Sequence, residues 1–455
     1  MPSYFADHAL LPSGWAEHVR IDVANGDIAA VVPGSAPDGA EHLHGIAVPG
    51  MADLHSHAFQ RAMAGLAERA GPEGDNFWSW REVMYRFLAR LSPDDIEAIA
   101  AQLYVELLKH GYTAVAEFHY LHNDPAGQPY ENRGELAERI LAAAGATGIG
   151  LTLLPVLYQT SQFGGKPPNE GQRRFVMATD AFLAMVDKLL HRHRRDPQVR
   201  IGIAPHSLRA VPPEPLRTAV DAITAADAAA PIHIHAAEQT KEVEDCIAWS
   251  GKRPVEWLLE NSGMGERWCL VHCTHMTSHE MQALARSGAV VGLCPTTEGN
   301  LGDGVFPLPA FLAAGGRFGI GTDSNVATSP VEELRWLEYV QRLVMRGRNV
   351  TEKTIGAATG ANLYRRALAG GAQALGRPVG ALAEGKRADI VVLDPDHPAL
   401  IGRSGDTLLD SWIFSGNDNP VRDVMVGGHW VVRDRFHPHE DQALANYRRA
   451  VTRLG

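Results

Sequence analysis

Short apolar runs alternate with longer amphipathic stretches through the middle of the chain, from about residue 45 to residue 325. The apolar runs carry few polar positions, which is typical of parallel strands buried on both faces of a sheet. The stretches between them repeat apolar residues at helical spacing. The predicted strands are 46–54, 113–118, 149–157, 199–205, 231–237, 267–273, 289–294 and 317–323. The predicted helices are 95–109, 131–145, 175–194, 214–229, 240–261, 278–287 and 331–347.

Eight strand–helix units in a row favour an α/β fold built on a closed, TIM-like (β/α)8 barrel. Periodicity does not show closure, so an open, doubly wound sheet remains an alternative. Both flanks contain short alternating runs, and Asn25-Gly26 and Gly427-Gly428 are hairpin turn signals. Because neither flank can bury a core alone, we expect the two to combine in a small β-sandwich. The predicted domains are residues 1–47 (N-terminal part of the sandwich), 48–379 (barrel) and 380–455 (C-terminal part of the sandwich and a terminal helix).

Composition and charge exclude several classes of function. The 455 residues include 42 Lys and Arg against 53 Asp and Glu, a net charge of −11, and no block of basic residues. Such a chain is a poor candidate for binding nucleic acid or an anionic membrane. The sequence has neither a membrane-spanning apolar run nor a secretory signal pattern. Its four cysteines form no Cys-x-x-Cys pair, so we expect a cytoplasmic protein.

Histidine is unusually frequent, with 21 copies, and some of these lie where barrel strands end. His55 and His57 close the first predicted barrel strand. Residues two apart on a strand point to the same face, so one ion can meet both imidazoles. The alternative is that two histidines occur there by chance, but the carboxyl end of a barrel strand is where active sites are built.

Three later strands also end in residues that can carry chemistry. His235 closes the fifth strand and Glu238 follows it, although His233 shares the strand and leaves the choice of ligand open. His272 closes the sixth strand. Asp323 closes the eighth, where an aspartate can be a ligand and a base or merely the N-cap of the next helix.

A barrel brings the ends of these strands onto one rim, so residues distant in sequence can converge. Three imidazoles and a carboxylate suit Zn²⁺, with Fe²⁺ as the second choice. When one coordination position stays open, a bound water becomes acidic enough to serve as a nucleophile. The pattern therefore predicts a metal-dependent hydrolase.

The chain resembles the amidohydrolase superfamily over nearly its whole length. The resemblance rests on PGMADLHSH (49–57), the HxxE after the fifth strand, HCTH (272–275), GTDSN (321–325) and EGKRADIVVLD (384–394). It implies a distorted (β/α)8 barrel with a β-sandwich formed by both termini. The fourth strand ends without the lysine that two-metal members use, which implies the branch of deaminases with one metal ion per chain.

Residue roles follow from this resemblance. It implies that His55, His57, His235 and Asp323 bind the metal, and that Asp323 also accepts the proton of the attacking water. It further implies that Glu238 passes a proton to the leaving nitrogen, and that His272 orients the water and the tetrahedral intermediate.

Within that branch the chain resembles the formimidoylglutamate deiminase family. The residues concerned are HAFQRAMAGLAE (57–68), FWSWREVMY (77–85), EFHYLHN (117–123), APHSLRAV (204–211) and TTEGNLGDG (296–304). The resemblance implies hydrolysis of N-formimidoyl-L-glutamate to N-formyl-L-glutamate and ammonia in histidine degradation, by attack of metal-activated water on the formimidoyl carbon. It also implies a homodimer. The substrate contacts that it implies are Gln60, Arg81, Tyr120, His206 and Arg209.

Two arginines agree with this substrate on chemical grounds. Arg209 lies just after the fourth strand and Arg81 in the loop after the first, and guanidinium groups bind carboxylates bidentately. The alternative for either is an ordinary surface arginine. A rival function is deamination of a purine, pterin or other heteroaromatic ring on the same scaffold, and a further one is a non-catalytic scaffold with a structural metal. We expect Trp78 and Trp80 to pack a loop, and Cys294 to be a packing residue.

Overall fold

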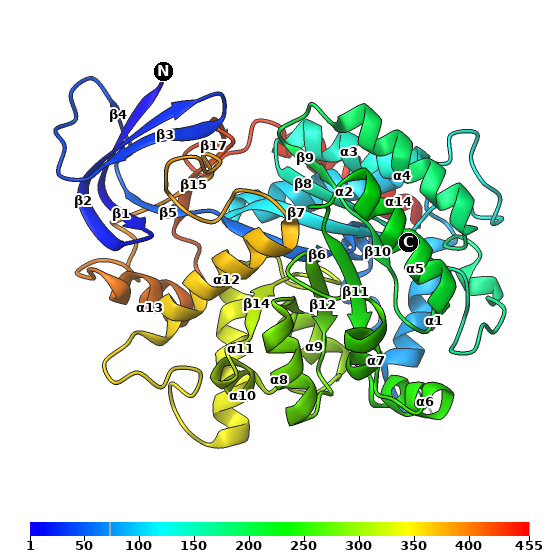
Figure 1. The fold of residues 1–455 in the computed structure, drawn as a ribbon. Helices are drawn as coiled ribbons and strands as arrows, with labels where there is room; N and C mark the ends of the chain where they lie inside the picture. The colour runs from blue at the N-terminus through cyan, green and yellow to red at the C-terminus, as the bar shows by residue number, and fades with distance from the viewer. Residues whose placement is uncertain (72–73, 455) are drawn as a thin grey trace.

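The computed structural model describes residues 1–71 and 74–454, and its centre is a barrel of parallel strands (Figure 1). The strands run next to one another in chain order, as predicted. They are β6 (Met51–Ser56), β7 (Tyr112–His119), β8 (Gly150–Leu157), β9 (Val199–Ile201) continued by β10 (Ala204–Pro205), β11 (Ile232–Ala236), β12 (Trp268–His272), β13 (Val290–Leu293) and β14 (Arg317–Ile320).

Backbone pairing at two seams closes these strands into a barrel. At one seam Ile203 pairs in parallel with Ile232, and at the other Ser56 pairs in parallel with Asp323. At the second seam the His57 N–H donates to the Asp323 carbonyl at 2.9 Å, and the Asp323 N–H donates to the His55 carbonyl at 2.8 Å. The closed barrel is therefore confirmed and the open sheet is excluded.

Helices surround the barrel (Figure 1). The main ones are α2 (Pro93–Lys109), α3 (Glu135–Thr147), α4 (Thr179–His193), α5 (Pro213–Ala226), α6 (Thr240–Ser250), α7 (Pro254–Asn261), α8 (Ser278–Ser287), α11 (Pro330–Met345) and α12 (Thr359–Leu375). Further helical elements lie in the connections that follow strands, and these are η1 (Ala58–Met63), α1 (Phe77–Leu88), η2 (Glu170–Gln172), α9 (Pro295–Leu301) and α10 (Leu308–Ala313).

Helix α2 shows how local sequence sets these elements. Ser92 caps its start: the Ser92 side chain accepts from the N–H of Asp95, and the Asp95 carboxylate accepts from the N–H of Ser92. Pro93 occupies the first helical position, where its missing N–H costs nothing. One face then packs on the barrel through Ile96, Ile99, Leu103 and Leu107.

Two connections differ from their prediction. The helix predicted over 240–261 is broken into α6 and α7, because Gly251 adopts a left-handed φ of 74° and Pro254 starts a new helix. The stretch 65–80, predicted to be irregular, ends in the first turn of α1, whose N-cap is Asn76. The part of that stretch at 72–73 lies outside the described residues.

The two ends of the chain share one mixed sheet beside the barrel, which confirms the predicted small β domain. Its eight strands form one hydrogen-bonded sheet with a core separate from that of the barrel. Both predicted hairpins are present, at Asn25-Gly26 and Gly427-Gly428. The strands are β1 (Ser3–Leu11), β2 (Gly14–Ala24), β3 (Asp27–Val32), β4 (Glu41–His42), β5 (Ile46–Pro49), β15 (Ile390–Leu393), β16 (Val421–Val426) and β17 (His429–Val432). Helices α13 (Asp406–Phe414) and α14 (Glu440–Leu454) complete the C-terminal part.

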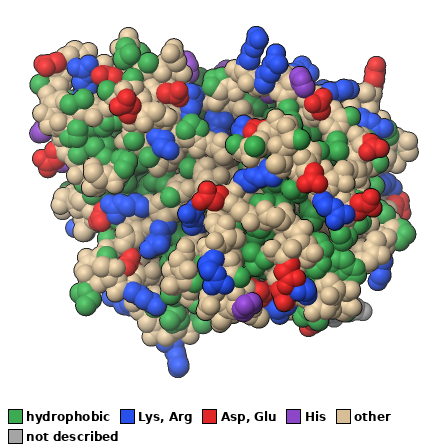
Figure 2. Space-filling model, in the orientation of Figure 1, with side chains coloured by type: hydrophobic (Ala, Val, Ile, Leu, Met, Phe, Trp, Pro, Cys, Tyr) green, Lys and Arg blue, Asp and Glu red, His purple; other side chains and the backbone are tan. Residues whose placement is uncertain are grey.

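Basic and acidic side chains are interspersed on the face of the molecule shown in Figure 2. This mixture agrees with the absence of basic blocks from the sequence. In the described part of the chain, no helix is both long enough and apolar enough to cross a membrane.

The close approach of α12 to β14 gives a test of the packing. A Cβ on Gly370 would lie 1.9 Å from the carbonyl oxygen of Phe318, so Gly370→Ala must push the helix off the strand. We expect it to lower the free energy of unfolding by about 1–3 kcal/mol, measured by thermal or denaturant unfolding. Gly145→Ala in α3 is the control: its Cβ would meet nothing within 4 Å, and we expect a gain of about 0.5–1 kcal/mol. Equal effects of the two substitutions would contradict this account of the packing.

Candidate metal centre

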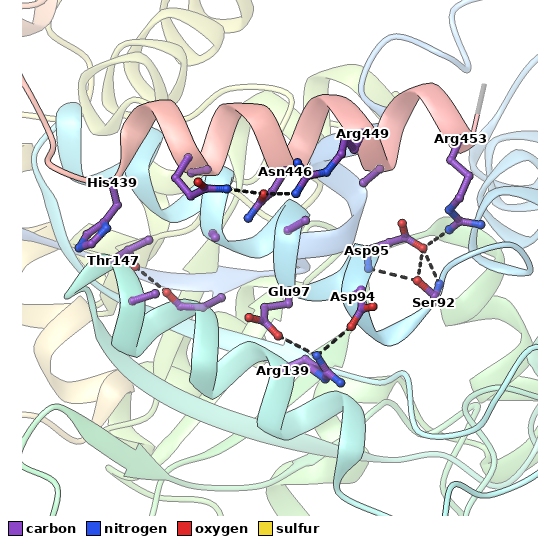
Figure 3. Close-up of a pocket in the computed structure, with 17 residues that line it drawn as sticks. Ser92, Asp94, Asp95, Glu97, Arg139, Thr147, His439, Asn446, Arg449 and Arg453 are labelled. Atoms are coloured by element: carbon purple, nitrogen blue, oxygen red, sulfur yellow. Dashed lines mark hydrogen bonds and ion pairs between the residues drawn. The ribbon is translucent and has the colours of Figure 1, made fainter.

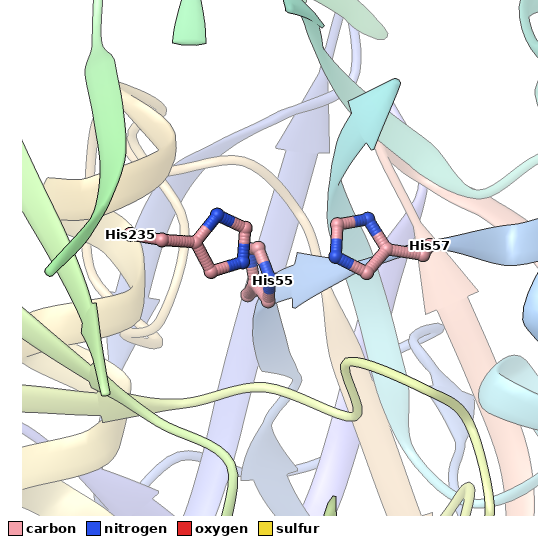
Figure 4. Close-up of side chains that lie close together, drawn as sticks. All are labelled: His55, His57 and His235. Atoms are coloured by element: carbon pink, nitrogen blue, oxygen red, sulfur yellow. The ribbon is translucent and has the colours of Figure 1, made fainter. Parts of the chain in front are cut away.

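Three imidazoles converge at one end of the barrel (Figure 4). His55 lies near the end of β6, His57 directly follows that strand, and His235 comes from β11 on the opposite wall. The ring centroid of His55 lies 4.7 Å from that of His57 and 4.8 Å from that of His235. All three rings are buried, and each offers a nitrogen within 4.8 Å of the others. The chain therefore holds a buried metal-binding site at the position predicted from the strand ends.

Neighbouring carbonyl groups orient two of the rings. His57 donates from Nδ1 to the carbonyl of Phe118 at 2.9 Å, and His235 donates from Nδ1 to the carbonyl of His206 at 3.2 Å. These bonds set the tautomer and leave Nε2 free to ligate. Neither ring nitrogen of His55 has a hydrogen-bond partner among the described residues. Buried nitrogens without a partner are costly, and an ion bound between the rings would remove this cost.

Burial keeps these imidazoles neutral, which is the form that binds metal. It lowers the pKa of His55 to about 3 and also lowers the pKa values of His57 and His235. His233, which the spacing left as an alternative ligand, instead uses Nε2 to donate to the carbonyl of Ala374 on α12. Only His235 of the two belongs to the cluster.

Asp323 supplies a carboxylate beside the imidazoles. Its Oδ1 lies 3.5 Å from Nε2 of His55 and 3.4 Å from Nε2 of His57. Burial alone would raise its pKa, but the interactions with the surrounding histidines lower it, so the group stays ionised. Its residue has a left-handed φ of 49°, and helix α11 begins only at Pro330. The N-cap alternative for Asp323 is therefore wrong.

Two further buried residues, His272 and Glu238, adjoin the carboxylate of Asp323. Nε2 of His272 lies 3.7 Å from Oε1 of Glu238 and 3.7 Å from Oδ2 of Asp323. Burial raises the pKa of Glu238 to about 7. For His272, burial lowers the pKa, but the negative charges of Glu238, Glu298 and Asp323 outweigh this and raise it to about 10. The carboxyl group of Glu238 therefore has a pKa near neutral pH and lies next to the cationic imidazole of His272.

Sequence reasoning missed Glu298, which orients His272. Its Oε1 lies 3.3 Å from Nδ1 of His272 and accepts the backbone N–H of Cys294 at 3.0 Å. Glu298 belongs to α9, directly after β13, and lies inside the TTEGNLGDG run that the sequence had singled out. The sequence did contain a signal for Glu298, because a polar residue directly after a barrel strand is a candidate for the active site.

All five predicted substrate contacts line the pocket over this centre. Gln60 Nε2 donates to the hydroxyl of Tyr120 at 2.8 Å, and its Oε1 has no hydrogen-bond partner among the described residues. The pocket is lined by His57, Gln60, Phe77, Trp80, Arg81, Met84, Tyr85, Tyr120, Tyr158, Phe175, His206, Arg209, His235, Glu238, His272, Thr297, Leu301, Asp323 and Ser324. His55 lies beneath this surface.

Two arginines line the pocket, of which Arg209 is buried and Arg81 is half-buried. Arg209 is 6% exposed, and the Oε2 of Glu238 lies 4.0 Å from its Nη2. The Nε atoms of Arg209 and Arg81 are buried without a hydrogen-bond partner in the described part of the chain. Trp78 packs beside both guanidinium groups, with its ring centroid 4.5 Å from Arg81 Cζ and 5.9 Å from Arg209 Cζ. Arg81 lies on α1 rather than in the predicted loop, so α1 forms a wall of the pocket.

The aromatic walls were also missed. Tyr158 directly follows β8, and Phe175 lies 5.4 Å from it between ring centroids. Tyr85 comes from α1. The position after a strand could have indicated Tyr158, and Tyr85 lies in the FWSWREVMY run (77–85), but nothing local marks Phe175, which reaches the pocket from outside the barrel strands.

A larger cavity of about 730 Å³ lies between α2, α3 and α14 (Figure 3). Most of its charged groups are paired: Arg139 contacts Asp94 and Glu97, and Arg453 contacts Asp95. None of the predicted site residues lines it. We therefore place the functional site at the histidine cluster and not in the larger cavity.

Comparisons with known proteins agree with this architecture. The model of the amidohydrolase family matches residues 46–431, and that of the formimidoylglutamate deiminase HutF N-terminal domain matches residues 1–45. A formimidoylglutamate deiminase of Pseudomonas aeruginosa is 56% identical over 97% of each chain. The crystal structure of an amidohydrolase from Brucella melitensis covers 100% of both chains with a TM-score of 0.94 and 49% identity.

A more distant structure shows the fold alone. An adenosine deaminase from Xanthomonas campestris with bound zinc superposes with a TM-score of 0.80 and 22% identity, over 99% of this chain and 98% of that one. The family model spans most of the residues, and the structure supplies a barrel whose strand ends carry a histidine cluster and a carboxylate. This chain belongs to the amidohydrolase family.

Proposed function

We propose that this chain hydrolyses N-formimidoyl-L-glutamate to N-formyl-L-glutamate and ammonia. The observation that carries the proposal is the pair of arginines in the pocket above the metal site, the buried Arg209 and the half-buried Arg81, whose buried Nε atoms have no hydrogen-bond partner among the described residues. Guanidinium groups that face a pocket in this way need anions, and a dicarboxylate supplies two. The high identity to a protein named formimidoylglutamate deiminase supports the same substrate.

The residues fit one zinc ion per chain, with Fe²⁺ as the second choice. His55, His57 and His235 would offer neutral nitrogen donors, and Asp323 would offer an ionised oxygen. When bound, such an ion lowers the pKa of a water ligand to about 7 and so makes a nucleophile available at neutral pH.

The pocket would hold the substrate by both ends. Arg209 and Arg81 bind the carboxylates of the glutamate part, and Trp78 keeps the two guanidinium groups in place. Gln60, Tyr120 and His206 supply polar contacts on the same wall. The cationic formimidoyl group then lies towards the carboxylates of Glu238 and Asp323.

Proton transfer decides which nitrogen leaves. Asp323 accepts the proton of the attacking water, and His272 orients that water and the tetrahedral intermediate. Glu238, with a pKa near 7, delivers a proton to the outer nitrogen, so ammonia leaves and the glutamate nitrogen stays. A heteroaromatic ring, the substrate of the rival function, would leave both arginines without a partner.

Substrate identity is tested by ammonia release. We expect the zinc-loaded enzyme to turn over N-formimidoyl-L-glutamate rapidly and to leave guanine and adenosine unchanged, because only the first carries two carboxylates. Turnover of a ring together with no reaction of the amidine would assign the metal site to the rival function.

Carboxylate recognition is tested by Arg209→Ala. Loss of a buried, charge-assisted contact lowers kcat/KM for N-formimidoyl-L-glutamate by about 100-fold or more, while the zinc content per chain stays unchanged. The matched control is Arg217→Ala, which removes an exposed arginine of α5 and leaves the kinetics as in the wild type. A kcat/KM near that of the wild type for Arg209→Ala would contradict the assignment.

Proton delivery is tested by Glu238→Gln. The amide keeps the size of the side chain but cannot donate the carboxyl proton, so we expect kcat to fall by about 10²–10⁴-fold with metal content retained. Glu244→Gln, on the exposed face of α6, is the control for a lost carboxylate and should leave kcat unchanged. Near-normal turnover by the Glu238 variant would refute its role.

A further inference from the structure

A second set of potential metal ligands lies beside the first. The set consists of His272, Cys294 and Asp323, and all three side chains are buried. Each offers one ligand atom, and these three atoms lie within 4.8 Å of one another. Glu238 adjoins this set, since its Oε1 is 3.7 Å from Nε2 of His272. The proposed function uses three of these residues for proton transfer and support of charge, but it gives no task to the thiol of Cys294.

The side chains are oriented as a ligand set. Glu298 occupies the Nδ1 side of His272, so Nε2 faces Asp323 and Glu238. Asp323 presents its two oxygens in different directions: Oδ1 lies near His55 and His57, whereas Oδ2 lies near His272. One carboxylate can therefore serve two neighbouring ions, as in two-metal sites.

The distances suit direct coordination. Tetrahedral zinc with bonds of 2.0–2.3 Å places its ligand atoms about 3.3–3.8 Å apart. The separations from His272 Nε2 to Glu238 Oε1 and to Asp323 Oδ2, both 3.7 Å, lie in that range. A thiolate among nitrogen and oxygen donors favours zinc or cadmium over magnesium or calcium.

We propose that His272, Cys294, Asp323 and Glu238 form a second, inhibitory site for a thiophilic divalent cation such as Zn²⁺ or Cd²⁺. Binding forms bonds to Nε2, Sγ and the two carboxylates, and the protons of the thiol and of the imidazolium leave to solvent. The ion occupies the side chains that the reaction needs for proton transfer, so turnover stops. The inhibition rests on the proposed function, whereas the binding does not.

Cadmium titration of the enzyme tests the binding. We expect protein loaded with one equivalent of Zn²⁺ to take up one Cd²⁺ per chain, counted by elemental analysis after desalting, and to develop a thiolate-to-cadmium absorption band in the ultraviolet. Cys294→Ser keeps the first zinc ion and the basal turnover but loses the band, and inhibition by Cd²⁺ or excess Zn²⁺ weakens by about tenfold or more. Cys246→Ser, which removes a buried thiol of α6, is the control and should behave as the wild type.

Each contrary result has a separate meaning. The site does not exist if the wild type binds no second ion, or if the band persists in both Cys294→Ser and Cys294→Ala. Binding without loss of turnover refutes the inhibition. If the enzyme releases no ammonia from N-formimidoyl-L-glutamate before cadmium is added, the proposed function fails, and the band and the metal count still decide on the second site.

Discussion

The pairing of β6 with the end of β14 is the constraint on which the functional site depends. This seam closes the barrel through two backbone hydrogen bonds, and both involve residues of the metal centre: His57 donates to Asp323, and Asp323 donates to His55. Asp53 reinforces the seam by accepting the N–H and the hydroxyl of Thr322. Since the same backbone atoms close the barrel and position the ligands, the barrel cannot close correctly without bringing the carboxylate to the imidazoles.

In the metal centre, neutral imidazoles and a charged imidazole lie within a few ångströms of one another. Burial removes the proton from His55, His57 and His235, whereas three carboxylates keep a proton on His272. Both effects come from the same low-dielectric surroundings: an isolated imidazole loses its charge there, but one facing carboxylates keeps it. One side of the pocket therefore offers neutral nitrogen ligands, and the other side holds a charged imidazole among carboxylates.

The cationic side chains of the pocket come from outside the regular barrel. Helix α1 contributes Arg81 and the ring of Trp78, and the loop after β10 contributes Arg209. These cations therefore lie on a helix and a loop beyond the barrel strands, apart from the histidine cluster. A family of barrels can then keep one set of metal ligands and change its substrate through the covering segments.

The sequence alone determined the strand–helix alternation, the hairpins at both ends of the chain and the residues that close the barrel strands, because these are set by local periodicity and turn chemistry. It could not show that the barrel closes, that His233 turns towards α12 while His235 joins the cluster, or that Asp323 is not a helix cap. It also gave no reason to connect Cys294 with Asp323, because their contact joins different strands. Such contacts depend on how the strands are arranged around the barrel, and burial then sets the charge of each group, so only the tertiary structure decided them.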